Sequence, residues 1–103
     1  MKYQYKFIGW CQEDNSDKVW IAIDLSEGNV NWSHSRPYVT IWGRRGKKLQ
    51  HKIVHCSSYE MGKLSKTKMD KGYREVFKEE LDQVYPEFEQ DLEKTAFWAT
   101  LKV

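Results

Sequence analysis

The sequence lacks the features that mark secreted, membrane and disulfide-rich proteins. Its 103 residues include only two cysteines, Cys11 and Cys56, and they have no Cys-x-x-Cys spacing. Two cysteines are too few for a disulfide framework, so we expect two free thiols in a reducing compartment. No apolar run approaches the roughly 20 residues of a membrane span, and the N-terminus has no apolar signal-peptide core. We therefore expect a soluble, intracellular protein that has no membrane partner.

Sequence motifs for catalysis and metal binding are equally scarce. There is no GxxxxGK[ST] phosphate loop, and Cys56 beside His55 has no visible third catalytic partner. His51 and His55 are four residues apart, a spacing that separates two residues of a strand by about 13 Å. That distance is too long for both side chains to bind one tetrahedral zinc ion. We predict no catalytic residue, no metal, no cofactor and hence no enzymatic activity.

Net charge is also low, at +2, but the charges are unevenly placed. Residues 1–43 carry a net charge of −1, residues 44–74 of +8 and residues 75–103 of −5. A local basic field of this kind attracts polyanions such as nucleic acids. The alternative is an ordinary solvated basic face. Aromatic residues make up 15% of the chain, and because large aromatics are enriched at interfaces, some of them are candidates for a binding surface.

The first half of the chain alternates between apolar and polar residues in the way typical of half-buried strands. The expected strands cover residues 3–11, 19–25, 38–43 and 49–56, joined by loops at 13–18 and 26–36 and a tight turn at 45–48. The alternation predicts that one face of the second strand enters the core, with Val19, Ile21, Ile23 and Leu25, and leaves Trp20, Ala22 and Asp24 on the other. In the third strand, Val39 and Ile41 are the expected core pair, which places Trp42 on the opposite face.

Helical signals dominate the second half. Ser57 followed three residues later by Glu60 is a capping-box pattern, which predicts a helix that begins near Ser58. Gly72 is placed to end that helix, and residues 73–77 are a short strand candidate. Residues 79–84 suggest one or two helical turns, and Pro86 suits the start of another helix. Its expected apolar face is Phe88, Leu92, Thr95 and Ala96, and residues 99–103 either fray or add a strand.

These elements predict an α+β fold. A small antiparallel sheet with one packed helix occupies residues 1–77. An acidic helical extension at residues 78–103 packs on the same domain. A chain of this length forms one domain with a single core.

The run Trp42-Gly43-Arg44-Arg45-Gly46 carries the clearest functional signal. The Trp42 ring offers a flat stacking surface, and the Arg44 guanidinium offers a planar fork that matches a phosphate. The two glycines permit a close backbone approach that a side chain would block. A stacking group beside a phosphate-binding group suits a protein that holds a nucleic-acid end.

This run, with a strand before it and Gln50 soon after, resembles the WGR domain. That module is found in poly(ADP-ribose) polymerases and in bacterial proteins. A second match is the end of the expected helix, where Lys68, Lys71, Gly72 and Tyr73 are similar to the family's Lys-Gly-Tyr-like turn. Residues 17–23 resemble the family's early strand, so that the similarity covers about residues 5–77.

The resemblance implies a small antiparallel sheet with a packed helix, and DNA binding near a strand break. It implies that Trp42 packs on the sugar–base end of a strand, that Arg44 contacts DNA and that Gly43 lets the backbone pass close to the ligand. Leu49 departs from the family, which usually has a glycine just before the glutamine. No polymerase catalytic domain fits within 103 residues.

We therefore predict a non-enzymatic module that binds DNA, or RNA, at ends, nicks or junctions through stacking and phosphate contacts. The predicted binding residues are Trp42, Gly43, Arg44, Arg45, Lys47, Lys48 and Lys52. Lys63, Lys66 and Lys71 are more typical of a helix surface. The bland alternatives are sheet packing for Trp42, a surface ion pair for Arg44 and a solvated face for the lysines.

The alternative function is a protein–protein adaptor. It would use the aromatic sheet face and the acidic C-terminal segment as docking surfaces. That segment is also a candidate for covering the basic face or for self-association.

Overall fold

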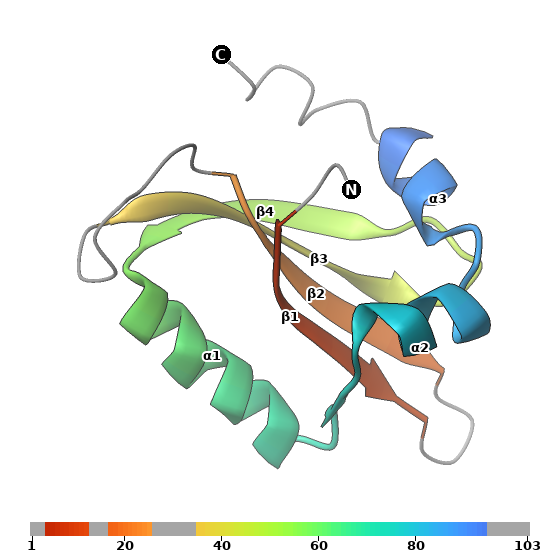
Figure 1. Ribbon diagram of the computed structural model, residues 1–103, viewed down its shortest axis with the longest axis horizontal. Helices are drawn as coiled ribbons and strands as arrows, with labels where there is room; N and C mark the ends of the chain where they lie inside the picture. Colours follow the sequence, from red (N-terminus) through yellow and green to blue (C-terminus); the bar gives the residue numbers. More distant parts are fainter. Residues whose placement is uncertain (1–3, 13–16, 26–34, 95–103) are drawn as a thin grey trace.

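Five strands and three helices make up the computed structural model, which describes residues 4–12, 17–25 and 35–94 (Figure 1). The strands are β1 (Gln4–Cys11), β2 (Lys18–Asp24), β3 (Arg36–Arg44), β4 (Gln50–Cys56) and β5 (Arg74–Glu75). Helix α1 (Ser58–Asp70) joins β4 to β5, and α2 (Lys78–Val84) and α3 (Phe88–Lys94) follow β5. The strands form one antiparallel sheet in the order β4-β3-β2-β1-β5. The predicted α+β class, with a packed helix and C-terminal helices, is confirmed.

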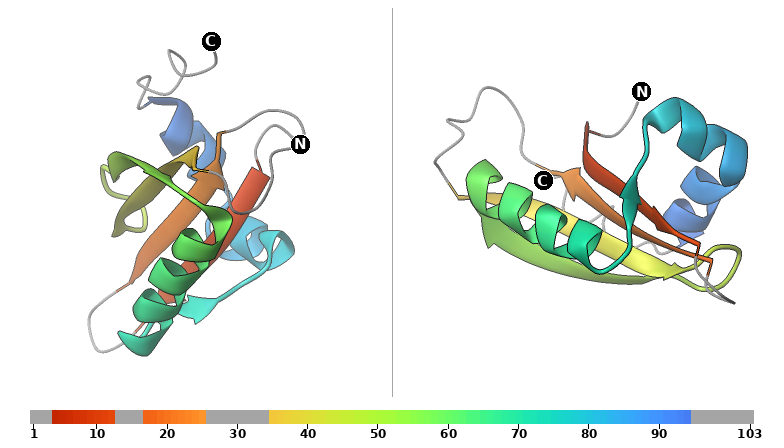
Figure 2. Two further views of the ribbon diagram at one scale, coloured as in Figure 1. Left: turned by 90° about the vertical axis from the view of Figure 1, so that its left-hand side faces the viewer. Right: turned by 90° about the horizontal axis from the view of Figure 1, so that it is seen from below.

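Both faces of the sheet are covered, and the two faces have different helices. The sheet runs between α1 on one side and α2 and α3 on the other (Figures 1 and 2). Val19, Ile21, Val39 and Ile41 are buried on the α2–α3 face, as the alternation predicted. Their burial stabilises the fold by roughly 1.5–3 kcal/mol for each aliphatic side chain.

The opposite face is also apolar where α1 crosses it. Trp20, Ala22 and Tyr38 are buried there together with Phe7 from β1 and Met61 from α1. The register of the sheet explains this grouping, because Phe7 pairs with Ala22 and Trp20 pairs with Trp42. Trp42 is half-buried at the margin of this second cluster. The face that the alternation placed opposite the core is therefore a second, smaller core.

Local signals fix both ends of α1. The Ser57 side chain accepts a hydrogen bond from the Glu60 backbone N–H, and the Glu60 carboxylate accepts one from the Ser57 N–H, which completes the predicted capping box. At the other end, the N–H groups of Gly72 and Tyr73 donate to the carbonyls of Met69 and Lys68. This is a Schellman motif, and Gly72 has the positive φ of 109° that such a cap needs.

Leu49, in the turn between β3 and β4, restricts which residue fits at position 43. Leu49 is buried in the α2–α3 face cluster, and a Cβ atom on Gly43 would lie 3.2 Å from its Cδ2 atom and 3.4 Å from its Cα. Gly43 also has a φ of 148°. A glycine is therefore needed at position 43, because Leu49 closes against the backbone there.

The C-terminal helices complete the larger core. Leu81 of α2, Phe88 of α3 and Tyr85 between them are each about 1% exposed and pack with the sheet residues of that face. The Tyr85 hydroxyl donates to the Asp91 carboxylate at 2.6 Å. Burial raises the pKa of Tyr85 above its usual value, and the Asp91 carboxylate raises it further. Residues 78–88 are thus part of the same hydrophobic core as the strands.

Some boundaries and faces differ from expectation. In α1, Met61 and Leu64 pack against the sheet, whereas Met69 is 40% exposed. Helix α3 begins at Phe88, two residues after Pro86. The loop expected at residues 13–18 lies outside the described residues except for 17 and 18, and that at 26–36 except for 35 and 36. Thr95, Ala96 and residues 99–103, and the side chain of Leu92, are not described either.

Candidate nucleic-acid interface

The α1 face of the sheet continues beyond the helix as an aromatic and basic surface. The register aligns Trp20 with Trp42 across β2 and β3, and Thr40 with Lys52 across β3 and β4. Side chains alternate between faces along a strand, so these residues share the face that carries α1. Lys18, the first residue of β2, pairs with Arg44, the last residue of β3, on the same face. The strand pairing thus gathers residues that are distant in sequence onto one surface.

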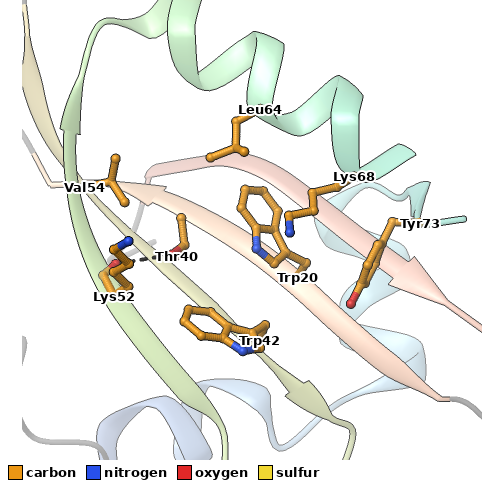
Figure 3. A pocket seen from close by; sticks show the side chains of 8 residues that line it. All are labelled: Trp20, Thr40, Trp42, Lys52, Val54, Leu64, Lys68 and Tyr73. Carbon is orange, nitrogen blue, oxygen red and sulfur yellow. Dashed lines mark hydrogen bonds between the residues drawn. The ribbon is translucent and has the colours of Figure 1, made fainter. Parts of the chain in front are cut away.

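A pocket of about 260 Å³ opens between α1 and this face of the sheet. Its walls come from β2, β3, β4, α1 and the turn after α1 (Figure 3). The lining residues are Trp20, Thr40, Trp42, Lys52, Val54, Leu64, Lys68 and Tyr73. Figure 3 shows Trp20 in the middle of the pocket, with Lys68 beside it and Trp42 below it. The Thr40 hydroxyl donates to the Lys52 carbonyl at 3.3 Å, so it is already used.

The charges on the pocket are positive. The Lys68 ammonium lies 5.4 Å from the centre of the Trp20 ring, and the Lys18 ammonium lies 5.7 Å from the centre of the Tyr73 ring. Burial lowers the pKa of Lys68 below its usual value of 10.5, and the charges of Lys71 and Lys18 lower it further.

Within residues 4–12, 17–25 and 35–94, no carboxylate forms an ion pair with Lys18, Lys52 or Lys68. The described ion pairs lie elsewhere, among them Arg36 with Asp24 at the start of β3 and Arg74 with Glu80 near α2. The pocket therefore combines aromatic rings with an excess of positive charge. Such a surface attracts a planar anion and repels a cation.

Two of the predicted binding residues line the pocket, and a third adjoins it. Trp42 and Lys52 are part of its walls. Arg44 is exposed at the end of β3 on the same face as Trp42. Gly43 lies between them, and Leu49 packs against it.

The other predicted residues lie further away. Lys47 and Lys48 are exposed in the turn between β3 and β4, outside the pocket lining. Of the α1 lysines, Lys63, Lys66 and Lys71 are exposed, and Lys63 lies 4.7 Å from the centre of the Tyr59 ring.

Arg45 has a structural partner instead. Its guanidinium donates to the Asp17 carboxylate at 2.6 and 3.0 Å, donates to the Val84 carbonyl of α2, and lies 5.8 Å from the centre of the Trp10 ring. The Trp10 indole N–H donates to the same carboxylate at 2.7 Å. This hydrogen bond and those from Arg45 lower the pKa of Asp17. Arg45 therefore ties the β3–β4 turn to Asp17, just before β2, and to α2.

Sequence reasoning missed much of the pocket. Trp20, Val54 and Leu64 carry no functional signal in the sequence beyond the strand and helix patterns. Lys68 and Tyr73 have such a signal only through the resemblance. The alternation predicts that Trp20 and Trp42 lie on the non-core faces of two consecutive strands. The register between β2 and β3 then places the two residues opposite each other. Lys68 and Tyr73 reach the pocket because the Schellman motif at Gly72 turns the chain back.

Other chemistry finds little support in the described part of the chain. No group of three or more His, Cys, Asp or Glu side chains is placed to hold a metal ion there. His51 and His55 are exposed on β4. Burial raises the pKa of the Cys56 thiol above its usual value, which disfavours the reactive thiolate. Among the described helices, none is both long and apolar enough to span a bilayer.

Comparisons of this chain with known protein families, with curated proteins and with solved structures gave no match. A functional assignment for this chain therefore rests on the geometry of the site.

Proposed function

We propose that this protein is a non-enzymatic nucleic-acid-binding module of the WGR type that holds DNA through the surface around Trp42. Bases or sugars at a strand end, nick or junction contact the Trp42 ring, and Arg44 and Lys52 contact the flanking phosphates. Lys47 and Lys48 add to the positive field from the neighbouring turn. The affinity comes largely from phosphate contacts and falls with salt.

The observation that carries the proposal is the pairing of an accessible aromatic ring with uncompensated lysines on one face. Trp42 is half-buried, so part of its ring is open to a ligand. Lys52 and Lys68 stand in the same pocket and form no ion pair among the described residues. Stacking of one base on such a ring is worth about 1–3 kcal/mol.

Fluorescence anisotropy with nicked, blunt and single-stranded DNA at two salt concentrations tests the proposal. We expect salt-dependent binding by the full chain. Trp42→Ala should weaken it roughly 5- to 150-fold, which corresponds to the loss of one stacking contact. Lys52→Gln should flatten the slope of log affinity against log salt by about 0.7–0.9.

Lys66→Gln is the matched control, because Lys66 carries the same charge but is exposed on α1 outside the pocket. Thermal unfolding of each variant checks that Trp42→Ala still folds. Binding that is independent of salt, or equal losses in Lys52→Gln and Lys66→Gln, would contradict the proposal.

The adaptor role remains the second candidate, and one observation favours it. Phe77, at the start of α2, is 76% exposed and borders a groove formed with Tyr5 and Ile8 of β1. An exposed phenylalanine beside a groove is a common anchor for a protein partner. Sedimentation equilibrium of the full chain and of Phe77→Ser tests self-association through this groove. A monomer at all concentrations would remove the self-association form of this role.

A further inference from the structure

Lys68 has a position that the Trp-Gly-Arg motif does not account for. It lies in the last turn of α1, and its side chain extends down over the Trp20 ring into the pocket (Figure 3). Its backbone carbonyl accepts the N–H groups of Lys71 and Tyr73 at 3.0 and 3.1 Å. The helix cap therefore fixes the backbone from which Lys68 and Tyr73 reach the pocket.

Positive charge predominates around Lys68. Lys52 stands on the β4 wall of the same pocket, and Lys18 and Lys71 lie close enough to disfavour a further positive charge. Within the described residues, no carboxylate pairs with Lys68. Lys68 is half-buried and Lys52 is exposed, so both ammonium groups are open to an anion that enters the pocket.

The size and walls of the pocket restrict what that anion is attached to. A volume of about 260 Å³ far exceeds the roughly 30 Å³ share of one water molecule. It is smaller than the clefts of about 300–1,000 Å³ that hold drug-sized ligands. Trp20, Trp42 and Tyr73 supply aromatic walls, which suit one planar ring system. A ring beside an anionic group is the chemistry of a single nucleotide.

We propose that this pocket is a subsite for one unpaired nucleotide, in which Lys68 holds the phosphate and the aromatic walls hold the base. This inference deepens the proposed function and rests on it for the biological ligand. A base inside a duplex cannot enter the pocket without being unpaired and unstacked, which costs a few kcal/mol. The subsite therefore selects ends, gaps and single strands over an intact duplex.

The first test uses a nucleoside monophosphate alone. In NMR titrations of the full chain, we expect it to shift the indole N–H signals of Trp20 and Trp42. The indole of Trp10, which donates to Asp17 outside the pocket, is the internal control. The nucleoside without phosphate and inorganic phosphate should each bind more weakly. Shifts at Trp10 equal to those at Trp20, or no saturable shift at either pocket tryptophan, would overturn the subsite.

The second test uses single-stranded DNA and Lys68→Gln. We expect about tenfold weaker binding, typical of one lost charge-assisted contact, and a salt slope flatter by about 0.7. Lys68→Arg should restore part of the affinity, whereas Lys66→Gln should have little effect. The single strand should also bind more tightly than a blunt duplex, and this preference should shrink in Lys68→Gln.

These outcomes separate the subsite from the proposed function. If Trp42→Ala weakens DNA binding but Lys68→Gln matches Lys66→Gln, the subsite is wrong and the proposed function stands. If the full chain binds no DNA but the monophosphate shifts Trp20 and Trp42 in the wild type and not in Lys68→Gln, the proposed function is wrong and the pocket is a nucleotide site.

Discussion

At the scale of single residues, identical side chains in this protein have different roles because of where the strands place them. Arg44 and Arg45 are neighbours in sequence, yet Arg44 is exposed beside the pocket and Arg45 is tied to Asp17 and Val84. The tryptophans divide in the same way. Trp10 is a partner of Asp17, whereas Trp42 lines the pocket. Within this short stretch, Trp42 therefore lines the pocket and Arg45 is a structural tie.

Two glycines should respond in opposite ways to alanine. Gly43→Ala should lower the free energy of unfolding by about 1–3 kcal/mol, because position 43 has a φ of 148° and Leu49 stands 3.2 Å from the new Cβ. Gly62→Ala, in α1 with nothing within 4 Å of the new Cβ, should raise it by about 0.5–1 kcal/mol. Urea unfolding of both variants measures the difference. Equal effects in the two variants would contradict the role given to Leu49.

Lys68 should titrate below the usual lysine pKa of 10.5. Its pKa is lowered by burial and by Lys71 and Lys18, with Lys52 on the facing wall. The ammonium charge of Lys68 is therefore complete below this lowered pKa and is lost as the pH rises through it, before 10.5 is reached. NMR titration of isotope-labelled lysine side chains measures the pKa of Lys68. A value of 10.5 or above would contradict the burial and the like charges that surround this side chain.

At the scale of elements, local signals predicted more than long-range ones. The capping box at Ser57, the glycine end at Gly72 and the alternation of β2 and β3 depend on neighbours in sequence, and each is present as expected. The pocket depends on which face α1 covers and on how β3 aligns with β4. Packing between segments that are distant in sequence decides both features, so no local pattern specifies them. The alternation therefore predicts the face on which Trp20 lies but not that Trp20 lines a pocket.

The capping box at Ser57 makes a prediction for α1. Ser57→Ala removes the hydroxyl that accepts the Glu60 N–H and should lower the free energy of unfolding by about 1 kcal/mol. The hydrogen bond from the Ser57 backbone N–H, followed by that from its side chain, lowers the pKa of Glu60 below 4.5. Glu60 therefore contributes stability above pH 4.5, and this contribution is lost as the pH falls through its lowered pKa.

Chemical unfolding of the wild type and Ser57→Ala at neutral and acidic pH measures both effects. The difference between them should be smaller in acid, because protonated Glu60 no longer supports the box in the wild type. A difference that does not change with pH would mean that Glu60 has no part in the cap.

At the scale of the whole molecule, the resemblance and the core give different boundaries. The resemblance drawn from the sequence ends near residue 77, but the larger core continues through Leu81, Tyr85 and Phe88. Arg45 links α2 to the turn between β3 and β4 through the Val84 carbonyl. Helices α2 and α3 therefore cover the sheet face opposite the pocket.

The last prediction follows from that arrangement. Phe88→Ala should lower the free energy of unfolding by about 3–5 kcal/mol, because Phe88 is 1% exposed and packs edge-on against Tyr85. Phe77→Ala, at 76% exposure, should change it by no more than about 0.5 kcal/mol.

A domain has only about 5–15 kcal/mol of stability in total. A fragment of residues 1–77 loses Leu81, Tyr85 and Phe88 together, so we expect it to show no cooperative thermal transition. A cooperatively folded fragment would mean that the sheet and α1 suffice, and that the extension is a separable cover.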